Sequence, residues 1–466
     1  MIYIHRILTS LSIKVRSEWN FFLIEILAFS FWYLSLFPGR LGFDYSETIR
    51  LIQRGESTDW WTALFFWFMK LSSFWGKSIY ISSFLCLLIL TISIKFFISS
   101  IPAPITVLRK VHLSFILTPL YGVFGVTVSH DVTQTAGILI ALGLQFRKYS
   151  KVFLSRKQEL IYSLIASVLL LTTKTGYVVV FFLIAQFFLE KKSKQAIFIT
   201  LSISFIYICS SFGIKQDASN LVYQPFLADL KCIAQHPEAR LTNRDWAFLE
   251  LYADKGIWTK PISCASMDGA MVSFDATKFS NYSNTDFVKK YLNIVFKNPA
   301  IAIMAHIQRS SNALPPPFFQ VPLNQVDLNV NNPIGLNTNT MLQQGPELLH
   351  PSIDEPSVKI KTGFLRYFEA IALLPAFVIN QASWFWGWGG MWCWVLLIYA
   401  LKTLQIFKIR KLLMLYYPVI TTHLTLFLVG PVSVPRYVMS SILIGVILSL
   451  TLLFSNNFNH KKSQLP

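Results

Sequence analysis

Residues 175–194 read TGYVVVFFLIAQFFLEKKSK, an apolar run that is closed by Lys191, Lys192 and Lys194. The length of the run approaches the roughly 20 residues that a membrane-spanning helix needs. Lysine and arginine concentrate in the short cytoplasmic loops of membrane proteins. The stretch is therefore typical of a transmembrane helix that ends on the cytoplasmic side, and the same pattern recurs along the chain.

The composition excludes most other classes of protein. Of the 466 residues, 53% are apolar and 14% are charged, whereas about a quarter of the residues in a soluble chain are charged. A water-soluble enzyme, a disordered scaffold and a small disulfide-rich secreted protein are excluded. A net charge of +18 could indicate nucleic-acid binding, but the basic excess lies in short loops such as 147–157 and 408–411. Membrane topology explains such loops, and we expect no nucleic-acid partner.

The predicted fold is an all-α polytopic membrane protein with interfacial helices and one large outer-side domain. Apolar run length and flanking charge predict ten spans, at about 20–37, 79–97, 111–128, 132–146, 159–173, 175–190, 196–213, 386–401, 412–430 and 437–455. No small-residue cleavage site follows the first span, so we expect it to be retained and both termini to be cytoplasmic. Segments 60–76 and 363–381 are expected to lie along the outer surface of the membrane.

This topology divides the chain into three parts. Residues 1–213 form a transmembrane module of seven spans with the first outer loop, and 363–466 form an interfacial helix with three further spans. Residues 214–362 lie outside and are numerous enough to fold as a domain. Cys232 and Cys264 fall in this domain, on the oxidising side of the membrane, which predicts a disulfide between them; the alternative is two thiols. No Cys-x-x-Cys motif or His pair accompanies them, so they do not indicate a metal site.

Two carboxylates lie at the outer ends of predicted spans, where ionisable groups are costly and usually functional. Asp44 follows the first span, and a carboxylate partly withdrawn from water can serve as a general base; the alternative is a loop or cap hydrogen bond. His130 and Asp131 stand in a tight turn between two spans, where Asp131 could also simply cap the helix that begins at Val132.

Cations occupy the same predicted face. Lys174 interrupts two apolar runs, and it could contact a phosphate or act as a snorkelling anchor. His306 and Arg309 are three residues apart on the helix that follows Pro299, so they share one face, which could equally be solvated. Arg436 opens the last span from outside, against the usual charge bias. Carboxylates and cations together suit a lipid-linked phosphate donor, whose phosphate the cations would hold while a carboxylate deprotonates the acceptor hydroxyl.

This ordered set of motifs resembles the multi-span glycosyltransferases of the GT-C superfamily, in their bacterial branch. The landmarks, in chain order, are Pro38-Gly39 followed by Asp44, Asp59-Trp60-Trp61-Thr62, His130-Asp131, Lys174-Thr175-Gly176, Asn298-Pro299 followed by His306 and Arg309, and Arg436-Tyr437. The sequence departs from the family pattern at Trp61-Thr62, at His130 and at Lys174-Thr175. The resemblance extends over residues 38–437 as sparse landmarks.

The resemblance implies an inverting transferase that moves a sugar from a polyprenyl-phosphate donor to a cell-envelope glycan or lipid on the outer face of the membrane. By position, Asp44 would be the general base and Asp131 would assist it. His130, Lys174, His306, Arg309 and Arg436 would bind the donor. Some members of the family use a divalent metal, which stays open here because only Asp44 and Asp131 stand out as ligands. The alternatives are a polysaccharide polymerase or ligase, and a lipid-linked sugar transporter or flippase.

Overall fold

The computed structural model describes residues 20–37, 39–41, 43–58, 62–150, 154–212, 214, 224–260, 264, 284–310, 389–429 and 438–462. Within this part the chain is all-α apart from two strands of two residues each, β1 (Arg40–Leu41) and β2 (Thr127–Val128). The helices are Asn20–Ser35, α2 (Phe43–Gln53), α3 (Ala63–Ser72), α4 (Tyr80–Ser100), α5 (Ile105–Ile116), α6 (Pro119–Gly125), α7 (His130–Tyr149), α8 (Arg156–Leu170), α9 (Gly176–Leu189), α10 (Ser193–Ser211), α11 (Gln224–Ala234), α12 (Asn243–Leu249), α13 (Lys255–Thr259), α15 (Asn284–Lys297), α16 (Pro299–Arg309), α20 (Gly389–Lys402), α21 (Ile409–Val429) and α22 (Met439–Lys462).

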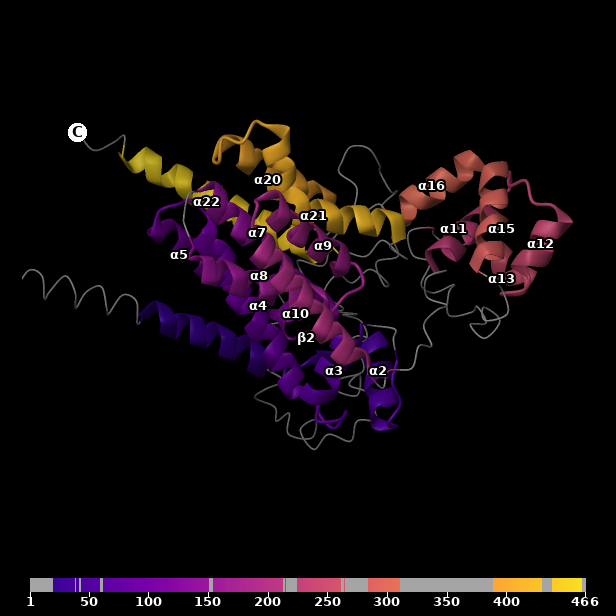
Figure 1. Cartoon of the computed structure of the whole chain (residues 1–466), viewed down its shortest axis with the longest axis horizontal. Helices are drawn as coiled ribbons and strands as arrows, with labels where there is room; N and C mark the ends of the chain where they lie inside the picture. The colour runs from indigo at the N-terminus through magenta and orange to yellow at the C-terminus, as the bar shows by residue number, and fades with distance from the viewer. Residues whose placement is uncertain are drawn as a thin grey trace, which may run out of the picture.

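Helix α7 is the central element of the helical bundle, packed between α4 and α8 (Figure 1). Most of its 20 residues are buried, which is unusual for a helix with so many polar side chains. Its start differs from the expected one. The helix begins at His130 and its N-cap is Ser129, whose hydroxyl accepts a hydrogen bond from the amide of Asp131. Asp131 is thus not the cap but a residue of the first turn, where a carboxylate interacts favourably with the helix dipole.

Among the residues that the structure describes, three helices are long and apolar enough to cross a membrane: Tyr80–Ser100, Ser193–Ser211 and Ile409–Leu428. The prediction of ten spans is therefore wrong by this criterion of length and composition. Five other apolar helices in the described part are shorter than 18 residues, among them Asn20–Ser35 and Gly176–Leu189. A helix rises about 1.5 Å per residue, so a helix such as Gly176–Leu189 falls short of the roughly 30 Å of a bilayer core. Helix α7 is long enough, but His130, Asp131 and two glutamines lower its hydropathy.

The segment 111–128, predicted as one span, contains a break. Helix α5 ends at Ile116 and α6 starts at Pro119, because Pro cannot donate the backbone hydrogen bond that would continue the helix. The side chain of Thr118 caps α6 by accepting from the amide of Tyr121. The indole of Trp32 donates to the carbonyl of Ile116 at 2.9 Å, so this buried carbonyl at the break is satisfied.

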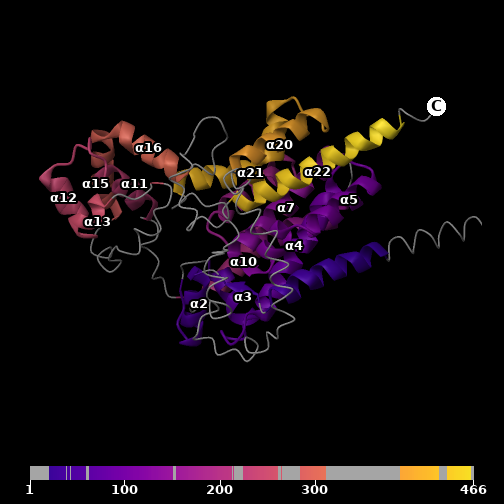
Figure 2. The same ribbon diagram turned by 180° about the vertical axis from the view of Figure 1, so that it is seen from behind.

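Helices α11, α12, α13, α15 and α16 gather at one end of the molecule, apart from the long helices, as both views show (Figures 1 and 2). They form a core of their own around Leu230, Phe248, Trp258 and Phe287. Cys232 of α11 and Cys264 are joined by a disulfide, with their Cα atoms 5.7 Å apart. These helices belong to the region 214–362; the predicted interfacial helix 363–381 lies outside the described residues.

The segment that follows the helix Asn20–Ser35 folds back against the start of α7. Strand β1 pairs in parallel with β2, with Arg40 opposite Thr127 and Leu41 opposite Val128. Helices α2 and α3 follow and pack on this pair through a small core that includes Tyr45, Phe65 and Val128. Within the segment 60–76, the helix α3 covers Ala63–Ser72, and Thr62 caps it. The pairing places the beginning of α2 beside the beginning of α7.

Candidate functional site

The first turn of α7 and the start of α2 meet in a buried cluster of polar side chains. The Tyr45 hydroxyl lies 2.8 Å from the Ser129 hydroxyl, 2.5 Å from Nδ1 of His130 and 3.5 Å from Oδ2 of Asp131. The Ser129 hydroxyl donates to the same Oδ2 at 2.9 Å. Tyr45 is 1% exposed and Asp131 is 3% exposed, so these bonds are made largely out of contact with water.

The backbone of Asp44 lies close to the same cluster, because the next residue, Tyr45, is part of it. It is the second residue of α2, directly before Tyr45, and α2 is fixed against α7 by the Tyr45 hydroxyl and by the β1–β2 pair. The side chain of Asp44 lies outside the described part of the chain. Its backbone position nevertheless brings the predicted base to the helix end that carries His130 and Asp131.

The turn between α8 and α9 is attached to the same end of α7. The hydroxyls of Thr133 and Thr172 lie 2.7 Å apart, and Gln134 Nε2 donates to the Thr175 hydroxyl at 2.8 Å. Thr173 closes the turn by accepting from the amide of Gly176 at 3.0 Å. Lys174 stands between these anchored residues and is exposed. The structure thus gathers four of the predicted residues, Asp44 by its backbone and His130, Asp131 and Lys174, at one end of the bundle.

His306 and Arg309 form a different cluster, in α16. Arg309 donates to both carboxylate oxygens of Asp229, from Nε to Oδ1 at 2.8 Å and from Nη2 to Oδ2 at 3.1 Å. His306 Nδ1 lies 3.2 Å from Asp229 Oδ2 and 2.8 Å from Arg309 Nη2. Burial would raise the pKa of Asp229, but the hydrogen bonds and charges of His306 and Arg309 hold that pKa below its ordinary value.

This second cluster joins helices α11–α16 to the bundle. The His306 ring stands edge-on to Phe427 of α21, with ring centroids 4.8 Å apart. Arg309 is 1% exposed and its guanidinium is engaged by a buried carboxylate. The shared face that the spacing of His306 and Arg309 predicts therefore turns toward Asp229. The remaining predicted cation, Arg436, lies outside the described residues, in the segment between α21 and α22.

Sequence reasoning missed three residues of these clusters. Ser129 has a visible signal, because Ser followed by His-Asp and an apolar run is a common way to begin a helix. Tyr45 stands next to the singled-out Asp44, but a Tyr in an interfacial loop has many ordinary uses. Asp229 lies on α11, 77 residues before His306, and no local pattern connects them.

A divalent metal would find few ligands in this site. Among the described residues, no three His, Cys, Asp or Glu side chains come close enough together to hold a metal ion. His130 and Asp131 supply two such groups, and both already interact with each other and with Tyr45. A metal bound here would need further ligands from Asp44 or from the substrate.

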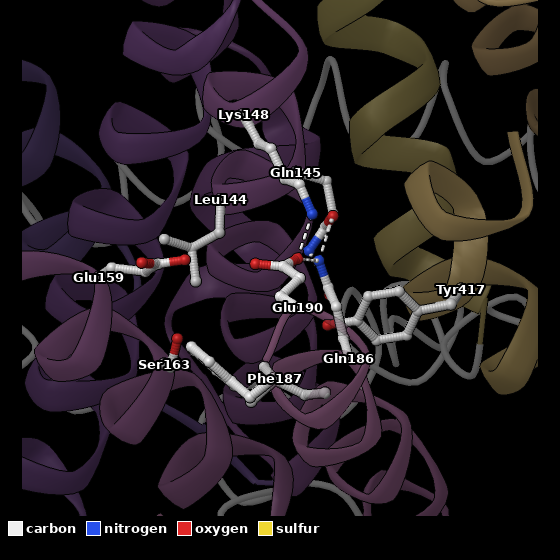
Figure 3. Close-up of a pocket in the computed structure, with 10 residues that line it drawn as sticks. Leu144, Gln145, Lys148, Glu159, Ser163, Gln186, Phe187, Glu190 and Tyr417 are labelled. Atoms are coloured by element: carbon white, nitrogen blue, oxygen red, sulfur yellow. Dashed lines mark hydrogen bonds and ion pairs between the residues drawn. The ribbon is translucent and has the colours of Figure 1, made fainter. Parts of the chain in front are cut away.

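A small polar cavity lies near the other end of α7 (Figure 3). In Figure 3, Gln145, Lys148, Gln186 and Glu190 point toward one another. Gln145 and Gln186 exchange hydrogen bonds, and Glu190 pairs with Lys148. The cavity volume of about 20 Å³ fits about one water molecule. Gln145 is 15 residues from His130, about 22 Å along the helix, so this cavity is neither large enough nor close enough to serve the cluster at Tyr45.

Comparison with known proteins adds no assignment: no protein-family model, curated protein or solved structure matches this chain.

Proposed function

We propose that this chain is a polytopic membrane glycosyltransferase that takes a sugar from a polyprenyl-phosphate donor at the outer face of the membrane. The observation that carries the proposal is the joining of three distant segments at one end of an apolar bundle. The start of α2, the start of α7 and the turn 172–175 meet there through Tyr45, Thr133 and Gln134. Together they supply two carboxylates and two basic side chains.

The proposed chemistry is a single displacement. The acceptor hydroxyl loses its proton to Asp44 as its oxygen attacks the anomeric carbon. The bond between that carbon and the donor phosphate oxygen breaks, and the phosphate leaves with the electron pair. Lys174 and His130 stabilise the departing phosphate, because positioned cations act on the charge that develops at a leaving group. Attack opposite the leaving group inverts the anomeric centre.

The remaining predicted residues divide between this site and a structural role. Asp131 supports the site by holding Ser129 and facing His130. We keep Arg436 as a donor-binding residue, since it precedes α22 in the chain. His306 and Arg309 are not assigned to the donor, because Asp229 already engages both. The helices α11–α16 would select the acceptor, a cell-envelope glycan or lipid.

The site requires a bilayer around the bundle and an outer compartment at the α2 end. Exposed apolar side chains support this arrangement. Phe198, Leu201 and Phe205 of α10 are at least half exposed, and a contiguous apolar surface of this kind indicates contact with lipid or with another protein. The proposed orientation puts both termini in the cytoplasm and the disulfide-bonded helices outside, where disulfides persist.

A second candidate, a lipid-linked sugar transporter, is favoured by one observation. Helices α5 and α6 break at Leu117–Thr118, and broken helices mark the substrate sites of many transporters. At this break, however, Trp32 satisfies the Ile116 carbonyl and all seven residues of α6 are buried. The break therefore resembles a packed connection more than a binding site.

The test compares wild type with Asp44→Asn in membranes that contain equal amounts of protein. Radiolabelled polyprenyl-phosphate sugars and native cell-envelope acceptors are supplied, and transferred label is counted. Loss of a general base should slow transfer roughly 10²–10⁴-fold. Glu47→Gln is the matched control, because it removes one negative charge one turn further along α2. Equal transfer by wild type and Asp44→Asn would exclude Asp44 as the base, and no transfer by folded wild-type protein from any donor would reject the enzyme class.

A further inference from the structure

The turn 73–78, which connects α3 to α4, has an unusual backbone. Phe74 and Trp75 have φ angles of 50° and 58°, and Gly76 follows with a φ of 80°. In this left-handed region the Cβ atom comes close to the following carbonyl oxygen, so bulky residues rarely adopt it. Two aromatic residues in succession therefore carry a conformational cost, which other contacts of the turn must offset.

Hydrogen bonds to the end of α3 and within the turn hold this conformation. The amide of Trp75 donates to the carbonyl of Lys70 at 2.8 Å. The amide of Ser78 donates to the carbonyl of Ser73 at 3.0 Å, and the Ser73 hydroxyl accepts from the amide of Gly76 at 2.9 Å. The turn is thus a defined structure whose backbone groups are paired.

Helix α2 is bound to the same turn. Nε2 of Gln53, the last residue of α2, donates to the carbonyl of Gly76 at 2.8 Å. A Cβ atom at Gly76 would lie 2.7 Å from Cγ of Gln53 and 3.2 Å from the carbonyl oxygen of Ile49, so this close approach requires glycine. Helix α3 is joined to α4 as well, since the hydroxyls of Ser72 and Ser82 lie 2.7 Å apart. Contacts with three helices therefore fix the position of the turn.

The turn directs apolar side chains outward. Trp75 is 56% exposed, Phe74 is 43% exposed, and Leu71 in the last turn of α3 is 56% exposed. On its buried side, α3 packs Phe65 and other side chains into the core that it shares with α2. Within the described part of the segment 60–76, the large apolar side chains that are exposed thus lie at the end of α3 and in the turn.

The position of this exposed surface in the chain indicates what covers it. Helix α4 starts at Tyr80 and is long and apolar enough to cross a membrane. Trp75 is only five residues before that start, and the ring of Phe74 contacts the ring of Tyr80, with centroids 6.3 Å apart. Residues directly before a spanning helix lie at the level of the lipid headgroups, where Trp and Tyr are enriched.

The charge of the surrounding segment suits the same partner. Lys77 is exposed beside the aromatic residues, and Nζ of Lys70 lies 4.8 Å from the centroid of the Trp67 ring. Residues 60–79 include no aspartate or glutamate. Aromatic side chains combined with lysine are typical of segments that lie in the membrane interface, because the rings enter the lipid while the lysines attract anionic headgroups.

We propose that the turn 73–78 is a membrane-interface anchor that inserts Phe74 and Trp75 among the lipid headgroups beside the start of α4. Because Gln53 and Gly76 bind the turn to α2, the anchor fixes the level of α2, and thus of Asp44, relative to the lipid. The anchor itself requires only that α4 crosses a membrane. Its value for reaching a lipid-linked donor rests on the proposed function.

The test measures the depth of the turn with spin labels on the full-length chain in a bilayer. In a chain without its three free cysteines, a single cysteine is introduced by Trp75→Cys, or by Leu71→Cys, which avoids the left-handed backbone. The labelled protein is placed in vesicles of phosphatidylethanolamine and phosphatidylglycerol. Two collision rates are measured, one with oxygen, which concentrates in lipid, and one with a water-soluble nickel chelate.

The ratio of the oxygen rate to the nickel rate should fall between those of two reference sites. Leu201→Cys is the lipid reference, because Leu201 is exposed on α10, which is long enough to span a membrane. Glu238→Cys, at an exposed position after α11, is the water reference. A ratio at both Leu71→Cys and Trp75→Cys equal to that of Glu238→Cys would place the turn in water and overturn the inference. Low rates with both reagents would show that protein covers the turn, and would overturn it too.

The link to α2 has its own measurement. Phe74→Ser combined with Trp75→Ser should increase the rate at which a label at Arg54→Cys, directly after α2, collides with the nickel chelate. Leu117→Ser is the matched control, because it removes an exposed apolar side chain elsewhere, and it should leave that rate unchanged. An equal rate in the double variant and in its parent would show that the turn does not set the level of α2.

The reference sites separate this inference from the proposed function. If the label at Leu201→Cys is itself in water, no bilayer surrounds the bundle, and both proposals fail. If Leu201→Cys is in lipid and the turn is in water, only this inference fails. Intermediate ratios at the turn support the inference even if the protein transfers no sugar.

Discussion

Asp229 is a buried carboxylate with several hydrogen-bond partners among helices α11–α16. It is 2% exposed, it accepts two hydrogen bonds from Arg309, and Tyr291 donates to it at 3.3 Å. A buried charge is stable only when partners replace the water that it loses. Removal of one partner from such a pair costs about 3–5 kcal/mol, because the other charge stays buried. The cluster should therefore decide whether α11, α15 and α16 remain packed.

The Asp229 cluster predicts a loss of stability in acid. The folded-state pKa of Asp229 is below its ordinary value, so its contribution is complete above the unfolded value of about 3.9 and is lost as the pH falls through the folded value. Thermal unfolding of the full chain should shift to lower temperature below about pH 4. Asp229→Asn should unfold at lower temperature at pH 7 and should show less of this acid dependence. Glu238→Gln removes an exposed carboxylate and should keep the wild-type profile; an Asp229→Asn profile equal to wild type would contradict the prediction.

At the scale of single residues, the sequence predicts which polar residues lie at helix ends better than it predicts which side chains they contact. Flanking apolar runs identified His130, Asp131 and Lys174 as polar groups at helix ends, and the structure brings those ends together. The spacing of His306 and Arg309 predicted one shared face. What that face contacts could not be predicted, because Asp229 is distant in the sequence. Tyr45 was missed for the same reason, since its partners Ser129 and His130 follow 84 and 85 residues later.

Among the helices, α7 decides the geometry of the site because everything else in the site is attached to its first turn. It approaches its neighbours closely at two glycines. A Cβ atom at Gly137 would lie 2.8 Å from Leu170 Cγ and 3.0 Å from the carbonyl oxygen of Ala166, both in α8. A Cβ at Gly143 would lie 2.8 Å from the ring of Phe96 in α4. Helix α8 leads directly into the turn 172–175, so the spacing between α7 and α8 sets the position of Lys174.

Gly137→Leu should therefore damage stability and the site together. The added side chain has no space against Leu170 and Ala166, and overpacking of this kind costs about 1–3 kcal/mol. It should also move the turn 172–175 away from Thr133 and Gln134. Thermal unfolding and the transfer assay measure the two effects. Gly256→Leu in α13 is the control, because nothing lies within 4 Å of a Cβ at that position. Equal unfolding temperatures for Gly137→Leu and wild type would show that α8 can shift without cost.

Elements were predictable where apolar length alone decides them. Helices α4, α10 and α21 correspond to predicted spans because each is long and predominantly apolar, and α21 continues through Pro418. The segment 111–128 was read as one span because its apolar side chains run through the break. A single dipeptide, Thr118-Pro119, divides it into α5 and α6, since Thr caps and Pro starts a new helix. A prediction based on apolar run length alone does not detect a helix break at a Thr-Pro dipeptide.

At the scale of the whole molecule, three features of the described residues bear on how the protein would sit in a membrane. The compact helices α11–α16 lie beyond one end of the bundle (Figure 1), where the disulfide also lies. Helix α10 exposes large apolar side chains along its length, including Ile197, Leu201 and Ile208. The last turn of α7, at the opposite end from Asp131, carries Arg147 and Lys148, and α8 begins with Arg156 and Lys157. A bilayer around α10, with these basic residues on the cytoplasmic side, would accommodate all three features.

This arrangement predicts that the two ends of α8 lie on opposite sides of the membrane. Lys174 after α8 and Lys157 at its start are both exposed, so each can be replaced by cysteine in a chain in which Cys86, Cys209 and Cys393 have been removed. Intact cells are treated with a membrane-impermeant maleimide. The cysteine of Lys174→Cys should be labelled, whereas that of Lys157→Cys should be labelled only after the membrane is opened. The disulfide keeps Cys232 and Cys264 unreactive and provides the background. Labelling of both positions in intact cells would contradict a membrane between them. Labelling in intact cells of the Lys157→Cys cysteine alone would place the cluster at Tyr45 on the cytoplasmic side. Nucleotide sugars, and not only lipid-linked donors, would then have access to that cluster.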